Sequence, residues 1–127
     1  MVNFEKQKNK SMEEVYQAGV SKLKAGHYKE AIEIFDNIID VDPRNADVIS
    51  ERGVCYLHLK NKEAALEDLN RALELEPEKS YRYSSRAFAR DFFGDVNGGI
   101  EDYQKAITLD PDDAIAHNNL GLLQEKL

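Results

Sequence analysis

Apolar residues recur along this chain at spacings of three and four, which is the pattern of a helix that buries one face. The clearest run is Ala31, Ile32, Phe35, Ile38 and Ile39. Glycine or polar residues interrupt the pattern after 13–24, 47–59 and 81–93, and a second apolar run follows each interruption. The sequence therefore predicts an all-α fold assembled from helix-turn-helix units.

These units repeat with one fixed period. The separation of Pro43 from Pro77 equals that of Pro77 from Pro111, and each proline ends a second helix, because proline lacks the backbone N–H that a helix needs. Rows of small and large residues keep the same spacing: Gly19, Gly53, Ala87, Gly121; Ala31, Ala65, Gly99; and Phe35, Leu69, Tyr103. Neither helix of a unit can bury its face alone, so adjacent units must stack.

The period divides the chain into predicted segments. Residues 1–11 form an N-terminal lead. Three full units follow, at 12–45, 46–79 and 80–113. Residues 114–127 are a capping helix or the first helix of a truncated fourth unit. We expect small residues in both helices of a unit to let the two backbones approach closely.

The chain resembles the tetratricopeptide repeat (TPR) family in its period, in its two rows of small residues and in the proline that ends each repeat. The tetrapeptides Leu75-Glu76-Pro77-Glu78 and Leu109-Asp110-Pro111-Asp112 are close to that family's usual repeat ending. The resemblance implies a right-handed superhelical solenoid of three full repeats plus one extra helix. It also implies a concave groove lined by the first helices, which binds a peptide or helix of a partner protein without catalysis.

Two arginines depart from the family pattern. Arg52 and Arg86 stand where leucine is more common in the family. We expect their aliphatic stems to pack and their charged ends to reach solvent.

Composition limits the possible partners and locations. The chain of 127 residues is 42% hydrophobic and 32% charged, which is typical of a soluble domain. No apolar run approaches the roughly 20 residues that span a bilayer, and no signal peptide is recognisable at the start. Together with a lone cysteine, this favours a cytoplasmic location and no membrane partner. The net charge of −7 argues against nucleic acid.

No group of residues indicates chemistry. His27, His58 and His117 each lack a second histidine or cysteine at helical spacing, so no metal site is predicted. Cys55 has no histidine nearby in the sequence that would activate it, and we expect a buried, inert thiol. The segment 94–99 is rich in glycine but has neither the strand before it nor the Lys-Ser or Lys-Thr after it that a phosphate loop needs. The sequence predicts no cofactor and no enzymatic activity.

Candidate binding residues come from the rows that the first helices would present to the groove. They are Tyr16, Val20, Ser50, Glu51, Val54, His58, Tyr81, Ser84, Ser85, Phe88, Phe92, Asn118, Asn119 and Leu122. Phe88 and Phe92 are four apart and share a helix face with Tyr81 and Ser85. Aromatic side chains beside hydroxyls and amides suit a partner segment with apolar anchors. The alternative is that Phe88 and Phe92 pack against neighbouring repeats.

One class of ligand is not expected. TPR domains that bind the acidic C-terminal tails of chaperones use a clamp of basic and amide side chains. In the family pattern, the five clamp positions fall here on Tyr16, Val20, Glu51, Tyr81 and Ser85. None of them is Lys, Arg or Asn, and Glu51 would repel a carboxylate, so we predict no binding of such tails. Because each full unit carries a charge of −3, a mildly basic or apolar ligand is favoured.

The last segment raises a second possible function. Leu120, Leu123 and Leu127 are expected to form an apolar strip that a missing second helix would have covered. The chain would then be cut from a longer array, or the strip would meet another copy in a weak homodimer. Three functions stay open: a binding scaffold or adaptor, a self-assembly module, and the regulatory part of a larger enzyme.

Overall fold

The computed structural model of the chain describes the backbone of residues 4–127 and the side chains of residues 11–127. The described residues form seven helices and no strand. The helices are α1 (Phe4–Lys24), α2 (Tyr28–Val41), α3 (Ala46–His58), α4 (Lys62–Leu75), α5 (Ser80–Phe92), α6 (Val96–Leu109) and α7 (Ala114–Gln124). This arrangement confirms the all-α solenoid predicted from the periodicity. The division into units at 12, 46, 80 and 114 remains a prediction.

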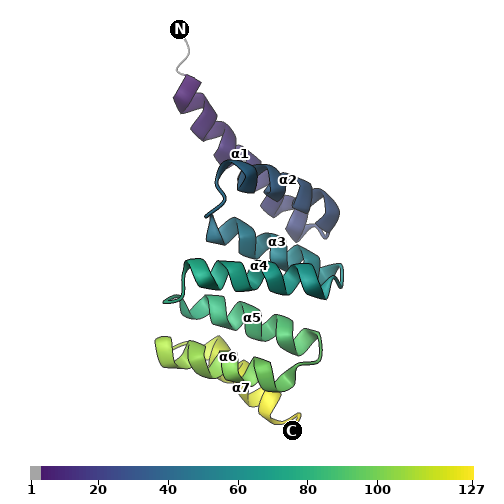
Figure 1. Cartoon of the computed structure of the whole chain (residues 1–127), viewed down its shortest axis with the longest axis vertical. Coiled ribbons are helices and arrows are strands. Elements are labelled where there is room, and N and C mark those ends of the chain that lie inside the picture. The colour runs from purple at the N-terminus through teal and green to yellow at the C-terminus, as the bar shows by residue number, and fades with distance from the viewer. Residues whose placement is uncertain (1–3) are drawn as a thin grey trace.

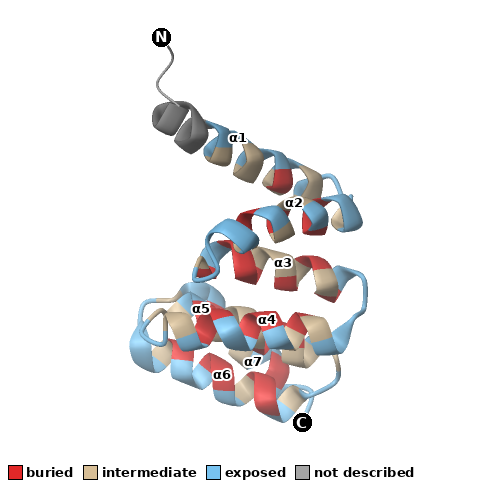
Figure 2. Cartoon of the chain, turned by 45° about the horizontal axis from the view of Figure 1, so that its top comes forward, coloured by how far each residue is buried: buried red, intermediate tan, exposed pale blue. Residues whose placement is uncertain are grey.

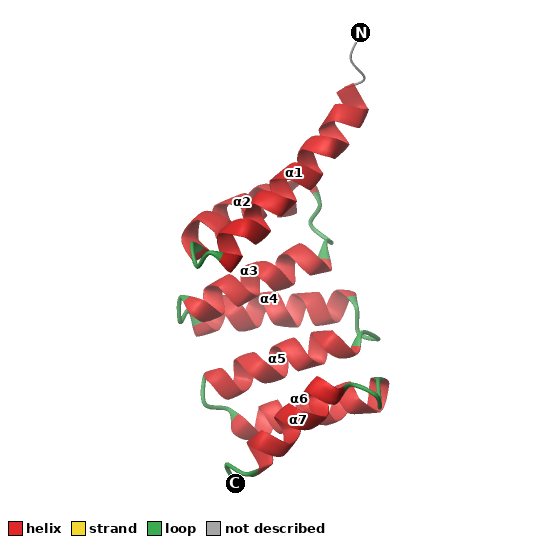
Figure 3. Cartoon of the chain, turned by 180° about the vertical axis from the view of Figure 1, so that it is seen from behind, coloured by secondary structure: helices red, strands yellow, loops and turns green. Residues whose placement is uncertain are grey.

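The helices stack one after another along the long axis of the molecule, with the two termini at opposite ends (Figure 1). Each helix packs chiefly against its neighbours in the chain, and short loops reverse the direction between them (Figure 3). We call α1, α3, α5 and α7 the first helices, and α2, α4 and α6 the second helices. Contacts are therefore local in sequence throughout, as expected of a stacked repeat array.

Side chains placed by the repeat begin most of these helices. Asn45, Asn61, Asp95 and Asp113 each accept a hydrogen bond from a backbone N–H further along the chain, at the starts of α3, α4, α6 and α7. Such caps satisfy N–H groups that have no partner within the helix. The turns inside each helix pair pass through a left-handed residue, at Gly26, Lys60 and Gly94, with φ of 82°, 62° and 92°. Lysine at this position is strained, whereas glycine is not.

Close packing within each helix pair explains the rows of small residues. An added Cβ on Gly19 would lie 2.5 Å from Cε1 of Phe35, a side chain with no solvent exposure. At Gly53 the same atom would lie 3.0 Å from Cβ of Asp68 and 3.3 Å from the carbonyl oxygen of Ala65. The buried positions of Figure 2 follow these seams between neighbouring helices. Small residues therefore allow the helix approach that the sequence predicts.

Helix α7 corrects the expectation of an open apolar strip. Leu123 is buried, with 3% of its surface exposed, and Leu120 packs against the same cluster of buried residues in α5 and α6. Of the three predicted strip residues, Leu127 alone is well exposed. The expectation was wrong because these leucines face the preceding helix pair. The uncovered side of α7 carries Gly121, which has no atom within 4 Å of an added Cβ.

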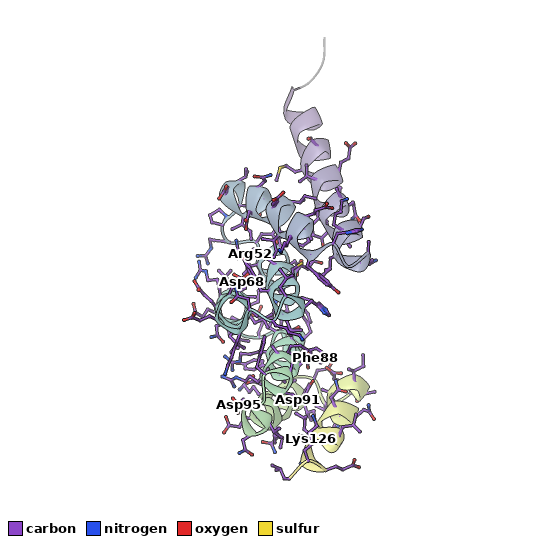
Figure 4. The ribbon with its side chains drawn as sticks, turned by 90° about the vertical axis from the view of Figure 1, so that its right-hand side faces the viewer. Arg52, Asp68, Phe88, Asp91, Asp95 and Lys126 are labelled. Carbon is purple, nitrogen blue, oxygen red and sulfur yellow. The ribbon has the colours of Figure 1, made fainter. Side chains whose placement is uncertain are left out.

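Arg52 and Arg86 also differ from expectation, because their charged ends are held by the protein. Arg52 donates two hydrogen bonds to Asp68, of 2.9 and 2.8 Å, and one to Asp36 in the preceding helix pair (Figure 4). Arg86 makes the same two-bond contact with Asp102, at 2.8 Å for both bonds. These pairs hold a first helix to its second helix and, through Asp36, to the preceding pair.

The first helix pair has apolar residues at the positions that correspond to this ion pair. Ala18 and Ile34 stand one repeat before Arg52 and Asp68. Burial raises the pKa of Asp68, while hydrogen bonds to Asp68 raise the pKa of Arg52. Because the pair is partly buried, removal of one partner would leave the other charge poorly compensated.

Candidate binding surface on the first helices

Large apolar side chains are exposed together on α5 and α7. The set is Tyr81, Phe88, Phe92, Ile115 and Leu122, with between 46% and 73% of each residue exposed. We call this set the apolar shelf. Large apolar groups are usually buried, so a group of them left open on neighbouring helices is the type of surface that partners cover. Phe88 and Phe92 are about half exposed, and whether they bind a partner or only pack against neighbouring repeats stays a prediction.

A pocket of about 330 Å³ opens beside the shelf, between α3, α5 and α7. It is lined by Val54, Leu57, Leu69, Tyr81, Ser84, Ser85, Phe88, Tyr103, Asp113, Ile115 and Asn119. We call it the central pocket. Its walls come from the first helices, and its floor includes Leu69 of α4 and Tyr103 of α6. It is a mainly apolar hollow with a few polar groups, as binding sites for anchoring side chains commonly are.

Some of the polar groups that line this pocket already have hydrogen-bond partners within the protein, and others do not. Asn119 donates a hydrogen bond of 3.3 Å to the hydroxyl of Tyr103, which links α7 to α6. The buried hydroxyl oxygen of Ser84 has no hydrogen-bond partner. Asp113 accepts a bond from the N–H of Ala116 as the cap of α7, and is the pocket's one charged lining residue. The apolar side chains therefore dominate what the pocket can hold.

The structure brings six of the residues predicted from sequence into the central pocket. They are Val54, Tyr81, Ser84, Ser85, Phe88 and Asn119. Leu122 lies with Phe88 in an adjoining hollow between α5 and α7. Figure 4 places Phe88 close to Asp91 and Lys126 at this end of the stack. The ammonium of Lys126 is 2.8 Å from a carboxylate oxygen of Asp91, so an ion pair borders the hollow.

Other predicted residues lie outside the pocket. Tyr16 donates a hydrogen bond of 3.0 Å to Glu51, and Val20 packs on the core of the first two helices. His58 stacks on Tyr28, with ring centroids 4.6 Å apart, and Asn118 is exposed on α7.

The prediction of a surface role for Ser50 is wrong. Ser50 is buried, because α3 has α2 and α4 on its flanks and also contacts α1.

Glu51 occupies an unusual environment for a carboxylate. One of its oxygens accepts the Tyr16 hydrogen bond, and the other is buried without a partner. Burial raises the pKa of Glu51, against the lowering effect of the Tyr16 hydrogen bond and the more distant Arg82 and Lys24. Burial, together with the neighbouring carboxylate, raises the pKa of Tyr16 to about 12. Burial therefore disfavours the charged form of Glu51, and its unpartnered buried oxygen weakens the fold there.

Arg82 connects the two halves of the surface. It is buried, and it donates hydrogen bonds to Asp47 at the start of α3 and to Glu76 at the end of α4. Its guanidinium also lies over the ring of Tyr81, 4.8 Å from the centroid. This contact joins an acidic edge of α3 to the apolar shelf of α5.

Groups that could perform chemistry are not assembled in the described part of the chain. Within it, no three His, Cys, Asp or Glu side chains are placed to hold a metal ion. Burial raises the pKa of the Cys55 thiol to about 11, so the thiol is protonated at neutral pH. None of the described helices is long and apolar enough to cross a membrane.

Sequence reasoning missed several residues of the site. Ile115 is the most exposed member of the shelf. It stands one repeat after Tyr81 and so belongs to a predicted groove row, but it was not chosen as a candidate residue. Leu57, Leu69 and Tyr103 also line the pocket, although their apolar spacing indicated only core packing. These side chains serve both the core and the pocket wall, a double role that spacing cannot reveal.

The fold is that of a known family. A family model described as a tetratricopeptide repeat matches residues 18–84, and a second, described as a TPR repeat, matches residues 94–127. The chain belongs to the tetratricopeptide repeat family. Comparison with curated protein sequences found no match.

Solved TPR structures are similar over most of this TPR chain. The first TPR domain of Spaghetti (RPAP3), bound to the HSP90 peptide SRMEEVD, is 28% identical with a TM-score of 0.81, covering 91% of each chain. The second TPR domain of human RPAP3, in complex with the HSP70 peptide SGPTIEEVD, is 28% identical with a TM-score of 0.78, covering 87% of this chain and 92% of that one. The Sgt2 TPR domain from Aspergillus fumigatus is 23% identical, with a TM-score of 0.83 and coverage of 91% and 78%, and shows the fold alone.

Proposed function

We propose that this TPR chain is a protein-interaction scaffold that binds a segment of a partner protein across the first helices, without catalysis. The observation that carries the proposal is the apolar shelf beside the central pocket. Removal of half-exposed aromatic and aliphatic side chains from water favours association, and such side chains commonly anchor protein interfaces. The peptide complexes of the two RPAP3 domains support the same type of function.

The proposed test removes the aromatic anchors while keeping the scaffold. The variant Phe88→Ser/Phe92→Ser removes apolar side chains that are about half exposed, so its helix content should be unchanged by circular dichroism. The control is Leu59→Ser/Leu109→Ser, which changes two exposed apolar residues at helix ends away from the shelf. We expect affinity capture from a lysate to retain a partner with the wild type and the control, and to lose it with the shelf variant. Identical capture by all three chains would contradict the proposal.

The proposal excludes acidic chaperone tails as ligands. The positions of the clamp are occupied by tyrosine, valine, glutamate and serine, and none of these is the basic or amide side chain that would hold a carboxylate. The peptide SRMEEVD, which the first RPAP3 domain holds in its solved complex, is the direct probe. We expect isothermal titration calorimetry to detect no saturable binding of this peptide. A low-micromolar dissociation constant would refute the exclusion.

Self-association is the second candidate function, and one feature of α7 favours it. Gly19 and Gly53 face a second helix at close range, whereas the equivalent side of α7 at Gly121 is uncovered. Leu127, with 77% of its surface exposed, lies at the end of the same segment. A second copy could cover this side. Light scattering over a range of concentrations decides: a constant monomer mass removes this candidate.

A further inference from the structure

We propose that the partner segment has two chemically different parts: apolar anchors that cover the shelf, and lysine or arginine residues that lie over an acidic rim on α1–α3. This inference rests on the proposed function and specifies the ligand of the same surface. We define the acidic rim as Glu13, Asp42 and Asp47.

The surface of the first helices changes character along the stack. One row of the repeat lies at the start of α3, α5 and α7 and at the equivalent place on α1; it consists of Glu13, Asp47, Tyr81 and Ile115. It is acidic on α1 and α3, and apolar on α5 and α7. All five shelf residues belong to α5 and α7. One partner segment crossing the surface therefore meets two different environments.

The rim borders a hollow of about 470 Å³ between the middle of α1, the end of α2 and the start of α3. Its apolar lining includes Met12, Ile38, Val41 and Val48, and its charged lining residues are the three carboxylates of the rim. All three acidic residues are exposed. Long basic side chains suit such a place, because their stems can pack on apolar groups while the charged end meets a carboxylate.

Among the described residues, the three rim carboxylates outnumber the basic side chains near them, which are Arg82 and the exposed Arg44, two residues after Asp42. Arg82 contacts Asp47, but it is shared with the carboxylate of Glu76. Lys126 pairs with Asp91 near the shelf, and Lys24 lies at the far end of α1 from the rim. The whole chain carries −7, which attracts a cationic segment over a longer range. Charge complementarity thus favours a basic partner over an acidic or neutral one.

The rim and the shelf approach each other at Asp47 and Tyr81. Arg82 bonds to Asp47 of the rim, and its guanidinium lies over Tyr81 of the shelf. Asp47 and Tyr81 are therefore neighbours joined by a single side chain. A partner segment needs no long linker between its apolar and basic parts.

A selection experiment identifies the ligand chemistry without a known partner. A phage library of random dodecapeptides is selected on the wild-type chain, after removal of phage that bind the Phe88→Ser/Phe92→Ser variant. We expect enriched peptides to combine large apolar residues with Lys or Arg. Enrichment of acidic peptides, or of apolar peptides without a charge preference, would overturn the inference and keep the proposed function. If no peptide is enriched that binds the wild-type chain better than the Phe88→Ser/Phe92→Ser variant, both the inference and the proposed function are overturned.

Charge reversal then locates the basic part of the ligand. The rim variant Glu13→Lys/Asp42→Lys changes exposed residues, and its control, Glu33→Lys/Glu101→Lys, makes the same change of net charge on α2 and α6. We expect the rim variant to bind an enriched peptide about tenfold more weakly at low salt, and the control less than about threefold more weakly. Equal losses in the two variants would show an effect of net charge alone and overturn the placement at the rim.

Discussion

The same substitution at related positions should have opposite effects on stability. Gly19 and Gly121 belong to the same row of the repeat, and both lie within first helices. Replacing glycine by alanine inside a helix favours folding by about 1 kcal/mol through backbone propensity. The outcome is then decided by the space available to the new methyl group.

At Gly121 the new methyl group meets no atom within 4 Å. Because α7 ends at Gln124, only part of the propensity gain applies, and we expect Gly121→Ala to stabilise by about 0.5 kcal/mol. At about 4 °C per kcal/mol for a chain of this size, the melting temperature should rise by about 2 °C.

At Gly19 the methyl group would lie 2.5 Å from Cε1 of Phe35. Phe35 has no solvent exposure and packs among Ala31, Ile32 and Ile38, so it cannot retreat without disturbing the core. Overpacking of this type costs about 2–3 kcal/mol, which exceeds the gain in propensity. We therefore expect Gly19→Ala to destabilise by about 1–2 kcal/mol and to lower the melting temperature by about 4–8 °C.

Thermal and urea unfolding followed by far-ultraviolet circular dichroism would measure both variants, with hydrogen exchange to report on α7 by itself. Stabilisation by Gly19→Ala would refute the role of the glycine row in close helix packing. Destabilisation by Gly121→Ala would show that this side of α7 is covered in solution, which would favour self-association.

Three further predictions concern single contacts. Lys60→Gly should relieve the left-handed strain and stabilise the chain by about 0.5–1 kcal/mol in urea unfolding, and no change would contradict the strain. Asp68→Ala should lower the free energy of unfolding by about 2–3 kcal/mol, because it leaves the Arg52 guanidinium poorly paired. The double variant Arg52→Ala/Asp68→Ile, which has the residues of the first helix pair at these positions, should lower it by less than about 1 kcal/mol. Equal losses in the two variants would refute the argument. Glu51→Gln should raise the free energy of unfolding at pH 7 but not at pH 4. Burial raises the pKa of Glu51 in the folded state, so the wild-type chain loses stability as the pH rises above the pKa of an unfolded carboxyl group, and glutamine avoids this loss. An effect of the same size in urea unfolding at both pH values would contradict this.

Local features of the sequence predicted the elements well. The even spacing of the prolines and the apolar spacing of three and four indicated the helices, and the family resemblance indicated the solenoid. They succeeded because each helix in a stacked array packs chiefly against its neighbours in the chain, so a short repeat carries much of the folding information.

Exposure was predicted less well. Phe88 and Ser50 both belong to rows assigned to the surface, but Phe88 is open and Ser50 is buried. Leu123, assigned to an open strip, packs under Gly99. The position of a residue in the repeat specifies on which side of its own helix the side chain lies. Whether the side chain is buried depends on which neighbouring helices cover that side.

The sequence by itself determined the number and order of the helices in this protein, because propensity, capping and helix termination act within a few residues. The length of α1 was not predicted, because this helix begins at Phe4, within the expected lead. Only the tertiary structure decided that Arg52 is held by carboxylates from two helices and that Asp47, Arg82 and Tyr81 join an acidic rim to an apolar shelf. These contacts depend on the angle and distance between packed helices. The angle and distance result from all the side chains at each interface together, and no single residue or spacing encodes them.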